Sequence, residues 1–296
     1  LIKLGILAPF KIIYLIFNLY ELILSIIFGK EVASLGRTSL LKKNGKLFQN
    51  IEHTSLNKDN FKAIIHTPNR ICEHRARTFS SKEPEILKWI DEHGNEEPFF
   101  DIGANIGLYS IYFAKMKKGE VFAFEPSVFN LSQLAKNISI NTLDNKIHII
   151  PNPLSNKNKI NKFIIADDIE GGALNAFGVD YGHDGKKMDS AYSYNLLGFS
   201  IDKLFEMNIL KTIPKLIKID VDGIEHLILE GAKKTLKSKK CKSVFVEVNY
   251  NFKEQSNAIC KILKECNFIL TNKPENTLIH SLKEKEFTYN EIWIKI

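Results

Sequence analysis

The sequence predicts a doubly wound α/β fold with a mainly parallel sheet. From Pro98 onward, short apolar runs alternate with longer amphipathic stretches, which is the pattern of strands separated by helices. The first of these runs leads into a glycine-rich turn and a helix start. The chain has 296 residues, of which 44% are hydrophobic and 25% charged, so one large domain with an appendage can bury a core. In such folds ligands bind at the carboxyl ends of the strands.

The expected elements follow from this alternation. Strands are predicted over 99–102, 121–124, 147–150, 216–219, 244–248, 268–270 and 292–296. Helices are predicted near 107–117, 127–140, 224–237 and 255–266. Strands joined through helices run parallel to their neighbours, and the resulting domain occupies residues 96–296.

The first 29 residues are strongly apolar and contain only three charges. Over 9–28 they fit a helix about 30 Å long at roughly 1.5 Å per residue, just long enough to cross a bilayer. Its less apolar residues share one stripe, which equally favours a helix lying in the membrane interface or packed on protein. A secretory signal is disfavoured because no small-x-small cleavage site follows.

The basic residues are concentrated just after this apolar segment. The net charge is +7, and the stretch 30–77 alone holds ten Lys or Arg against four acids. The near-neutral remainder argues against a nucleic-acid-binding protein, and the basic stretch indicates the anionic inner face of a membrane. Residues 30–95 are otherwise expected to form a connector, with a short strand at 61–66 and a helix near 83–92.

The cysteines indicate the compartment. Their spacing matches neither a metal pair nor a disulfide framework, so reduced thiols and a cytoplasmic domain are expected. They are Cys72, Cys241, Cys260 and Cys266.

The glycine-rich turn is the first motif with chemical meaning. Only glycine lets the backbone approach a ligand this closely, and the turn is expected to leave free amides beside it. Its leading acid either orients the loop or binds a ligand amine. The candidate cofactor-binding residues are Asp101, Gly103, Ala104, Asn105 and Gly107.

The second motif is Glu125-Pro126, at the end of the next predicted strand and 24 residues after Asp101. A carboxylate there can accept hydrogen bonds from both hydroxyls of a ribose. The alternative interpretation is a helix-start acid, because Pro126 suits a first turn and Glu125 suits the helix dipole. Since the turn lacks the third glycine of dinucleotide sites, a phosphate-free nucleoside such as S-adenosylmethionine is favoured over NAD.

Acidic residues at strand ends are the candidate catalytic groups. Asp220 follows the strand 216–219 and is the first choice to orient or deprotonate a hydroxyl nucleophile. Glu247, near the end of the next strand, is a second acid at the same edge. Glu225 is also a candidate, although it and Asp222 equally suit a helix start that binds backbone amides.

The segment 165–200 is rich in Gly, Asp and Tyr and is expected to be a long irregular segment, either a mobile loop or a lid that recognises sugar. His183 within it is a minor candidate for a general base. No metal-ligand spacing, nucleophile elbow or phosphate-binding loop is found in the sequence.

Taken together, these motifs resemble the FkbM family of S-adenosylmethionine-dependent methyltransferases over roughly residues 97–272. The resemblance also rests on Asn137 with Asn141, and on the stretches 201–204, 218–225 and 229–232. It implies a Rossmann-like class I methyltransferase sheet with an antiparallel last strand, and S-adenosylmethionine as cofactor. The acceptor it implies is a sugar hydroxyl in a glycan, glycolipid or related natural product.

One position departs from the family pattern: Asp222 stands where the family usually has Glu. Two other functions remain open, a nicotinamide-dependent oxidoreductase and an inactive membrane-associated scaffold that retains the fold.

Overall fold

The computed structural model describes residues 47–188, 191–271 and 288–296, together with Ile16, Leu19, Ile23 and Ile26. Apart from those four residues, the predicted apolar helix lies outside the described part, and so does the basic stretch before residue 47. In the part of the chain that is described, no helix is long and apolar enough to cross a membrane.

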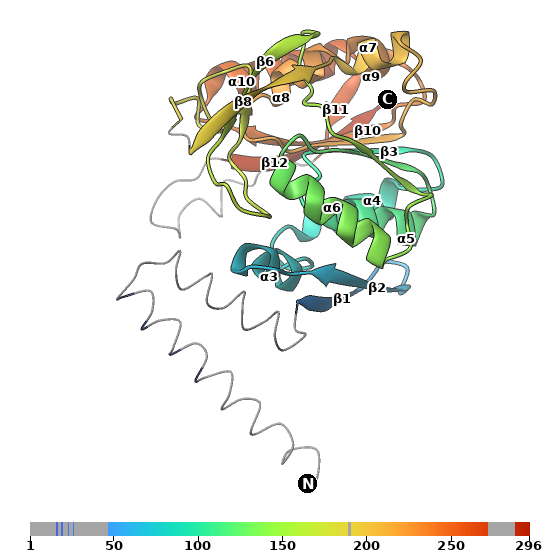
Figure 1. Cartoon of the computed structure of the whole chain (residues 1–296). Helices are drawn as coiled ribbons and strands as arrows, with labels where there is room; N and C mark the ends of the chain where they lie inside the picture. Colours follow the sequence, from blue (N-terminus) through green and yellow to red (C-terminus); the bar gives the residue numbers. More distant parts are fainter. Residues whose placement is uncertain are drawn as a thin grey trace.

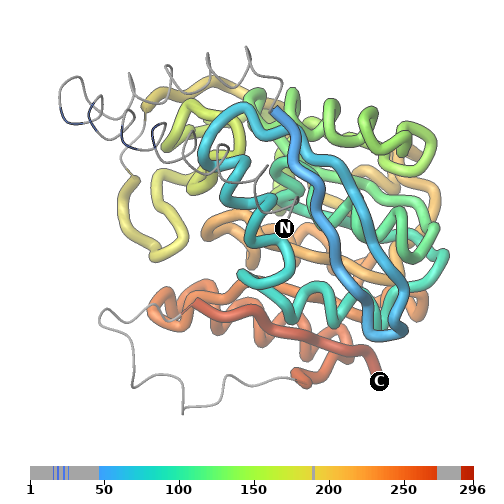
Figure 2. The backbone as a smooth tube through the Cα atoms, turned by 90° about the horizontal axis from the view of Figure 1, so that it is seen from below, coloured from blue at the N-terminus to red at the C-terminus, as the bar shows by residue number. Residues whose placement is uncertain are grey.

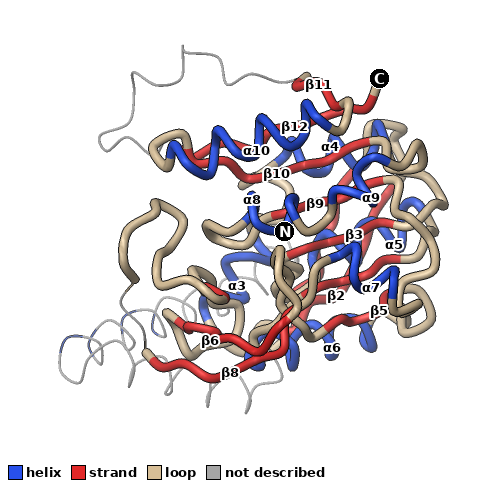
Figure 3. Tube along the Cα trace, turned by 90° about the horizontal axis from the view of Figure 1, so that it is seen from above, coloured by secondary structure: helices blue, strands red, loops and turns tan. Residues whose placement is uncertain are grey.

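A central sheet carries the domain (Figures 1 and 3). Its described strands are β3 (Phe99–Ile102), β4 (Val121–Phe124), β5 (Ile147–Ile150), β9 (Leu216–Ile219), β10 (Ser243–Asn249), β11 (Phe268–Leu270) and β12 (Thr288–Lys295). Their order is β11-β12-β10-β9-β3-β4-β5, and neighbours from β10 to β5 run parallel. The last strand, β12, is antiparallel to both β10 and β11. The predicted fold class, including the antiparallel last strand, is confirmed.

Helices cover both faces of this sheet. They are α4 (Pro84–His93), α5 (Leu108–Lys117), α6 (Val128–Ile140), α7 (Ile201–Glu206), α8 (Glu225–Glu230), α9 (Lys233–Lys237) and α10 (Lys253–Glu265). Successive strand residues point to opposite faces, so Phe99 packs in the core beneath α4, α5 and α6, and Phe100 packs in the core on the other face.

The single helix predicted over 224–237 is wrong, because α8 and α9 are separate helices. Gly231 lies between them, and a Cβ built on it would lie 2.3 Å from the backbone oxygen of Ser155. This close approach leaves no room for a side chain at the residue where α8 ends.

The described part of the N-terminal extension packs directly on the domain. It consists of β1 (Phe48–Thr54), β2 (Asn60–His66), which pair as an antiparallel hairpin, then α3 (Arg70–Arg77) and α4. The hairpin contacts α5 and α6 (Figure 2), and Ile51 and Phe61 belong to the same core as α5. The indole N–H of Trp89 on α4 donates to Ser243 on β10 at 2.8 Å. Residues 47–95 therefore share one core with the sheet.

A second, smaller sheet includes two strands from the region expected to be irregular. It contains β6 (Lys159–Ile165), β7 (Ala176–Phe177) and β8 (Tyr192–Gly198), in the order β7-β6-β8. The expectation of an irregular segment throughout 165–200 is thus wrong for β7 and β8, whereas the connections between these strands are turns and loops.

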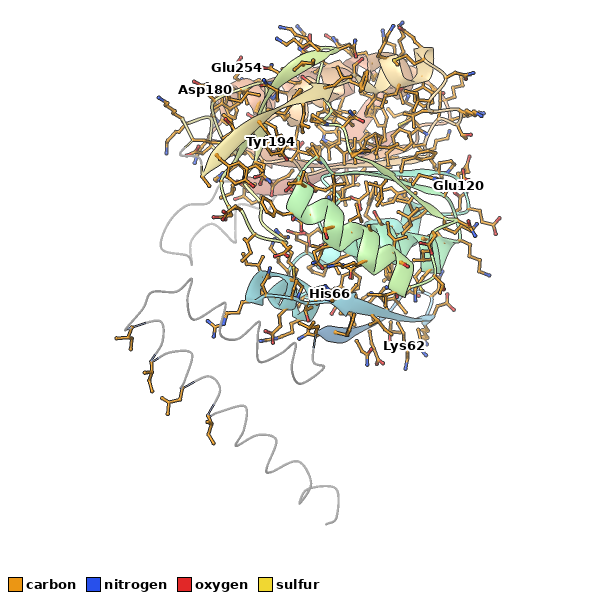
Figure 4. The ribbon with its side chains drawn as sticks, viewed as in Figure 1. Lys62, His66, Glu120, Asp180, Tyr194 and Glu254 are labelled. Carbon is orange, nitrogen blue, oxygen red and sulfur yellow. The ribbon has the colours of Figure 1, made fainter. Side chains whose placement is uncertain are left out.

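Asn137 on α6 and Asn141 at the end of α6 attach the extension to the domain. The Asn141 side chain accepts from the amide of Ile64 at 3.1 Å and donates to its carbonyl oxygen at 2.7 Å. The Asn137 side chain accepts a hydrogen bond from the amide of His66 at 2.8 Å and donates one to the carbonyl oxygen of Ile106 at 2.9 Å. His66 is labelled in Figure 4. These side chains join β2, α6 and the glycine-rich turn.

Replacing Asn137 by Ala is expected to destabilise the protein. The change leaves the His66 amide and the Ile106 carbonyl buried without these partners, and each such group costs about 1–3 kcal/mol. Chemical unfolding monitored by circular dichroism measures the loss. The control is Asn145→Ala at an exposed turn position; equal stability of the two variants would contradict the assigned role.

Candidate active site

Two cavities lie at the carboxyl ends of the central strands, where the sequence predicts ligand binding. The larger has a volume of about 170 Å³ and is lined by Glu125, Asp222 and Glu247 among others. The smaller has a volume of about 60 Å³. Both are lined by Arg75, Lys82, Glu83, Gly103, Asn105 and Asp220.

The glycine-rich turn is in close contact with Asp220, the residue that follows β9. Gly103 has φ +78°, and a Cβ built on it would lie 1.9 Å from the backbone oxygen of Asp220. Gly107 has φ +88°, and a Cβ built on it would lie 2.5 Å from the end of the Leu134 side chain. Gly103, Ala104 and Asn105 line a cavity, whereas Gly107 is absent from the linings of both and shapes the turn.

The amides of this turn were expected to be free, and this is wrong. The amides of Gly103 and Ala104 both donate to the carbonyl oxygen of Phe124. The amide of Asn105 donates to the Glu125 carboxylate, and the amide of Ile106 donates to the side-chain oxygen of Asn105. The amide of Gly107 donates to the carbonyl oxygen of Ala104. Because all five amides already donate hydrogen bonds within the protein, the turn has no free backbone N–H groups to bind a phosphate. The geometry therefore favours a phosphate-free ligand at this turn.

Glu125 is a buried carboxylate on the wall of the larger cavity. Its two oxygens accept from the amide of Asn105 at 2.8 Å and from the amide of Ser127 at 2.9 Å. Burial raises the pKa of Glu125 to about 7, although these hydrogen bonds oppose the shift. The contact with Ser127 fits the helix-start interpretation. The Asn130 side chain is a third hydrogen-bond partner of Glu125, and a carboxylate with about four acceptor positions retains capacity for a ligand hydroxyl. Pro126 lines the same cavity.

Asp101 and Lys218 form a buried ion pair, of which Lys218 lines the smaller cavity and Asp101 lies behind it. The ammonium of Lys218 lies 3.3 Å from Asp101 and 3.5 Å from Asp220, and 3.4 Å from the carbonyl oxygen of Gly103. Asp101 also accepts from Ser110 at 2.6 Å and is fully buried, so it orients the turn without lining a cavity. Burial alone lowers the pKa of Lys218, but Asp101 and Asp220 raise it above its ordinary value.

Lys218 was not among the candidate site residues predicted from the sequence. The sequence does contain a feature that marks Lys218: it is a lysine in the otherwise apolar strand 216–219, two residues before Asp220. A buried charge of this kind is kept only when it is paired.

The structure brings together two of the three predicted catalytic acids. Asp220 and Glu247 both line the larger cavity, and Asp220 also lines the smaller one. The Asp220 side chain is 32% exposed and pairs with Lys218. Burial, together with the neighbouring Asp220 charge, raises the pKa of Glu247 to about 9. This shift favours the protonated form of Glu247 at neutral pH.

Glu225, the third predicted catalytic acid, does not reach either cavity. It is fully buried, lines neither cavity, and accepts from the amides of Val221 and Gly223 and from the Gln255 side chain. The structure favours the alternative interpretation, in which Glu225 holds the backbone at a helix start. Burial raises its pKa to about 7.

Asp222 lies beside the larger cavity and binds a backbone amide of the loop 169–175 instead of one at the start of α8. It lines the larger cavity, and its carboxylate accepts from the amide of Leu174 at 2.7 Å. Burial and the neighbouring Asp220 raise its pKa to about 6.

The N-terminal extension supplies cavity residues that sequence reasoning missed. Arg75 at the end of α3 donates from Nε to the carbonyl oxygen of Gly171 at 2.7 Å. Glu83, just before α4, accepts from the hydroxyl of Tyr109 and from Lys82, each at 2.8 Å. No local pattern marks these residues, because only packing of the extension brings them to the cavities.

A loop segment, residues 169–175, forms one wall of the larger cavity. The side-chain amides of Asn105 and Asn130 both donate to the carbonyl oxygen of Gly172. This joins the loop to the glycine-rich turn and to α6. His183, farther along, lines neither cavity. Over the described residues, no group of three or more His, Cys, Asp or Glu is arranged to hold a metal ion.

Comparison with solved structures gives distant similarities. An FkbM methyltransferase from Methylobacillus flagellatus KT is 16% identical with a TM-score of 0.41; the match covers 67% of this chain and 43% of that one. A methyltransferase from Streptococcus mutans, solved in complex with S-adenosylhomocysteine (SAH), is 11% identical with a TM-score of 0.42, covering 68% and 90%. This chain thus spans less than half of the Methylobacillus protein.

The family assignment comes from the sequence profile. A search of curated proteins found no match. The family model of the methyltransferase FkbM domain matches residues 101–270, which is more than half of the chain and contains the glycine-rich turn, Glu125, Lys218 and Asp220. The chain belongs to the methyltransferase FkbM domain family.

Proposed function

We propose that the protein transfers a methyl group from S-adenosylmethionine to a sugar hydroxyl in a glycan, glycolipid or related natural product. The observation that supports this best is the placement of Glu125 and Asp220 on the walls of one cavity, in a chain of this family. When bound, the cofactor supplies an electrophilic methyl group on its sulfonium.

The residues of the larger cavity fit such a cofactor. A nucleoside without phosphates needs a ribose acceptor, which Glu125 provides, and needs no phosphate cradle, which the turn 103–107 does not offer. Gly103, Asn105 and Pro126 complete the wall beside Glu125.

The acids around the larger cavity are suited to a polyol acceptor. Asp220, held by Lys218, is positioned to accept a hydrogen bond from the nucleophilic hydroxyl and to take its proton. Glu247, protonated at neutral pH, is able to donate a hydrogen bond to a second hydroxyl. A carboxylate that accepts a hydrogen bond and a carboxyl group that donates one can thus bind two adjacent hydroxyls of a sugar.

Binding and product analysis test the proposal. Calorimetry of the purified protein should show binding of SAH, weakened by Glu125→Ala, and no comparable binding of NAD. Mass spectrometry of surface glycans and lipids from cells with and without the gene should show loss of one methyl group. If SAH does not bind, the proposal fails; if only peptides or small metabolites change, the sugar acceptor is wrong.

The affinity for SAH is expected to rise with pH between about 6 and 8. The pKa of Glu125 is raised to about 7, so the carboxylate that accepts the ribose hydroxyls is lost as the pH falls through 7. Calorimetry at several pH values measures this. Asp222, with its pKa raised to about 6, titrates nearby, so Glu125→Gln is the control. This variant should bind more weakly and lose most of the pH dependence, and an unchanged profile would exclude Glu125 as its source.

We place the reaction at the inner face of the cytoplasmic membrane, because the apolar residues 1–29 are followed by the basic stretch 30–77. Fractionation of cells that make the full chain tests this location, and recovery only in the soluble fraction would contradict it.

A further inference from the structure

The smaller cavity carries charged groups of both signs. Its walls include the cations Arg75 and Lys82 and the carboxylates of Glu83 and Asp220. The Lys218 ammonium on its wall is already paired with Asp101 and Asp220. A small cavity of about 60 Å³ with both signs is complementary to a zwitterion.

The Arg75 guanidinium has hydrogen-bond donors without a partner among the described residues. Its Nε donates to Gly171, and no described residue is a hydrogen-bond partner of its two terminal amino groups. These two groups form the planar edge that binds a carboxylate through two parallel hydrogen bonds. Lys82 pairs with Glu83, yet its side chain is 57% exposed and free to move toward a ligand.

Glu83, which lines the same cavity next to Lys82, is suited to bind a cation. Although burial favours its neutral form, hydrogen bonds from Lys82 and Tyr109 hold the pKa of Glu83 below its ordinary value. It is therefore ionised at neutral pH. A carboxylate oxygen that accepts one hydrogen bond retains capacity for another.

The two cavities share wall residues. Gly103, Asn105 and Asp220 line both, so a ligand whose ribose lies on Glu125 passes this turn on its way to the smaller cavity. An anionic acceptor is a poorer occupant than a zwitterion, because Glu83 and Asp220 lie in the smaller cavity and Asp222 in the larger one.

We propose that the N-terminal extension completes the cofactor site: Arg75, assisted by Lys82, binds the α-carboxylate of S-adenosylmethionine, and Glu83 binds its α-ammonium group. This inference rests on the proposed function. It assigns a ligand role to residues 75–83, which lie outside the region 101–270 that matches the family model.

A comparison of two ligands tests the inference. SAH has the amino-acid end, whereas 5′-methylthioadenosine has the same nucleoside and thioether without it. In calorimetry on the full chain, Arg75→Ala should weaken SAH binding about tenfold and 5′-methylthioadenosine binding less than about twofold. Arg77→Ala, an exposed residue of the same helix that lines neither cavity, is the matched control and should change neither.

A second variant separates binding from loop support, because Arg75 also holds Gly171. Lys82→Ala leaves that hydrogen bond intact and should again weaken SAH more than 5′-methylthioadenosine. Equal weakening of both ligands by Arg75→Ala would overturn the inference, as would unchanged SAH affinity with a raised KM for the acceptor. Absence of binding of either ligand to the unaltered protein would overturn the proposed function as well.

Discussion

Replacing Asp220 by Asn is expected to lower the turnover number by about 10²–10⁴-fold, the contribution typical of a positioned acid–base group. The change keeps the shape of the side chain and removes the charge that we propose accepts the hydroxyl proton. Because Asp220 lies where the two cavities meet and is partly exposed, it is accessible to an acceptor. SAH is expected to bind the variant within about threefold of the unaltered protein, since Glu125 is untouched.

The measurement is kcat with the natural acceptor, alongside the Kd for SAH from calorimetry. Asp144→Asn, at an exposed position that lines neither cavity, is the matched control. Glu247→Gln separates the two acids. If Glu247 were the base, its raised pKa would make the rate rise with pH up to about 9, Glu247→Gln would abolish that rise, and Asp220→Asn would retain most activity.

The central sheet was predictable because its strands are short, almost wholly apolar runs. Buried parallel strands have this composition, and β3, β4, β5 and β9 have the predicted bounds. The small sheet escaped prediction because β6 and β8 are largely exposed and mix polar with apolar residues. Their pairing joins Lys159 to Gly198, a long-range contact that no local pattern records.

The site was predictable to the extent that its residues belong to strand ends. Asp220, Glu125 and Glu247 reach the cavity because the carboxyl ends of parallel strands meet at one edge. Arg75 and Glu83 come from an extension whose position is set by packing and by the Asn137 and Asn141 hydrogen bonds. Those bonds depend on the folded chain, so local sequence patterns do not reveal them.

Replacing Gly103 by Ala is expected to remove SAH binding and to lower the free energy of unfolding by about 2–5 kcal/mol, from the left-handed backbone and from the steric overlap. The added Cβ would lie 1.9 Å from the carbonyl oxygen of Asp220, and backbone cannot rotate away as a side chain can. The turn and residue 220 would have to separate, which moves the cofactor wall and the proposed base together. Thermal unfolding and calorimetry measure the two effects.

Gly182→Ala is the matched control for this substitution, because its new Cβ would meet only the flexible side chain of Met188 at 3.2 Å. It should unfold near the temperature of the unaltered protein. If Gly103→Ala bound SAH with unchanged affinity, close contact between the turn and residue 220 would not be needed for the cofactor site. Loss of binding with retained folding would show that this contact sets the distance between the nucleoside wall at Glu125 and the acid at Asp220. Methyl transfer needs the acceptor oxygen, the methyl carbon and the sulfur in line, so we expect the glycine to control that distance.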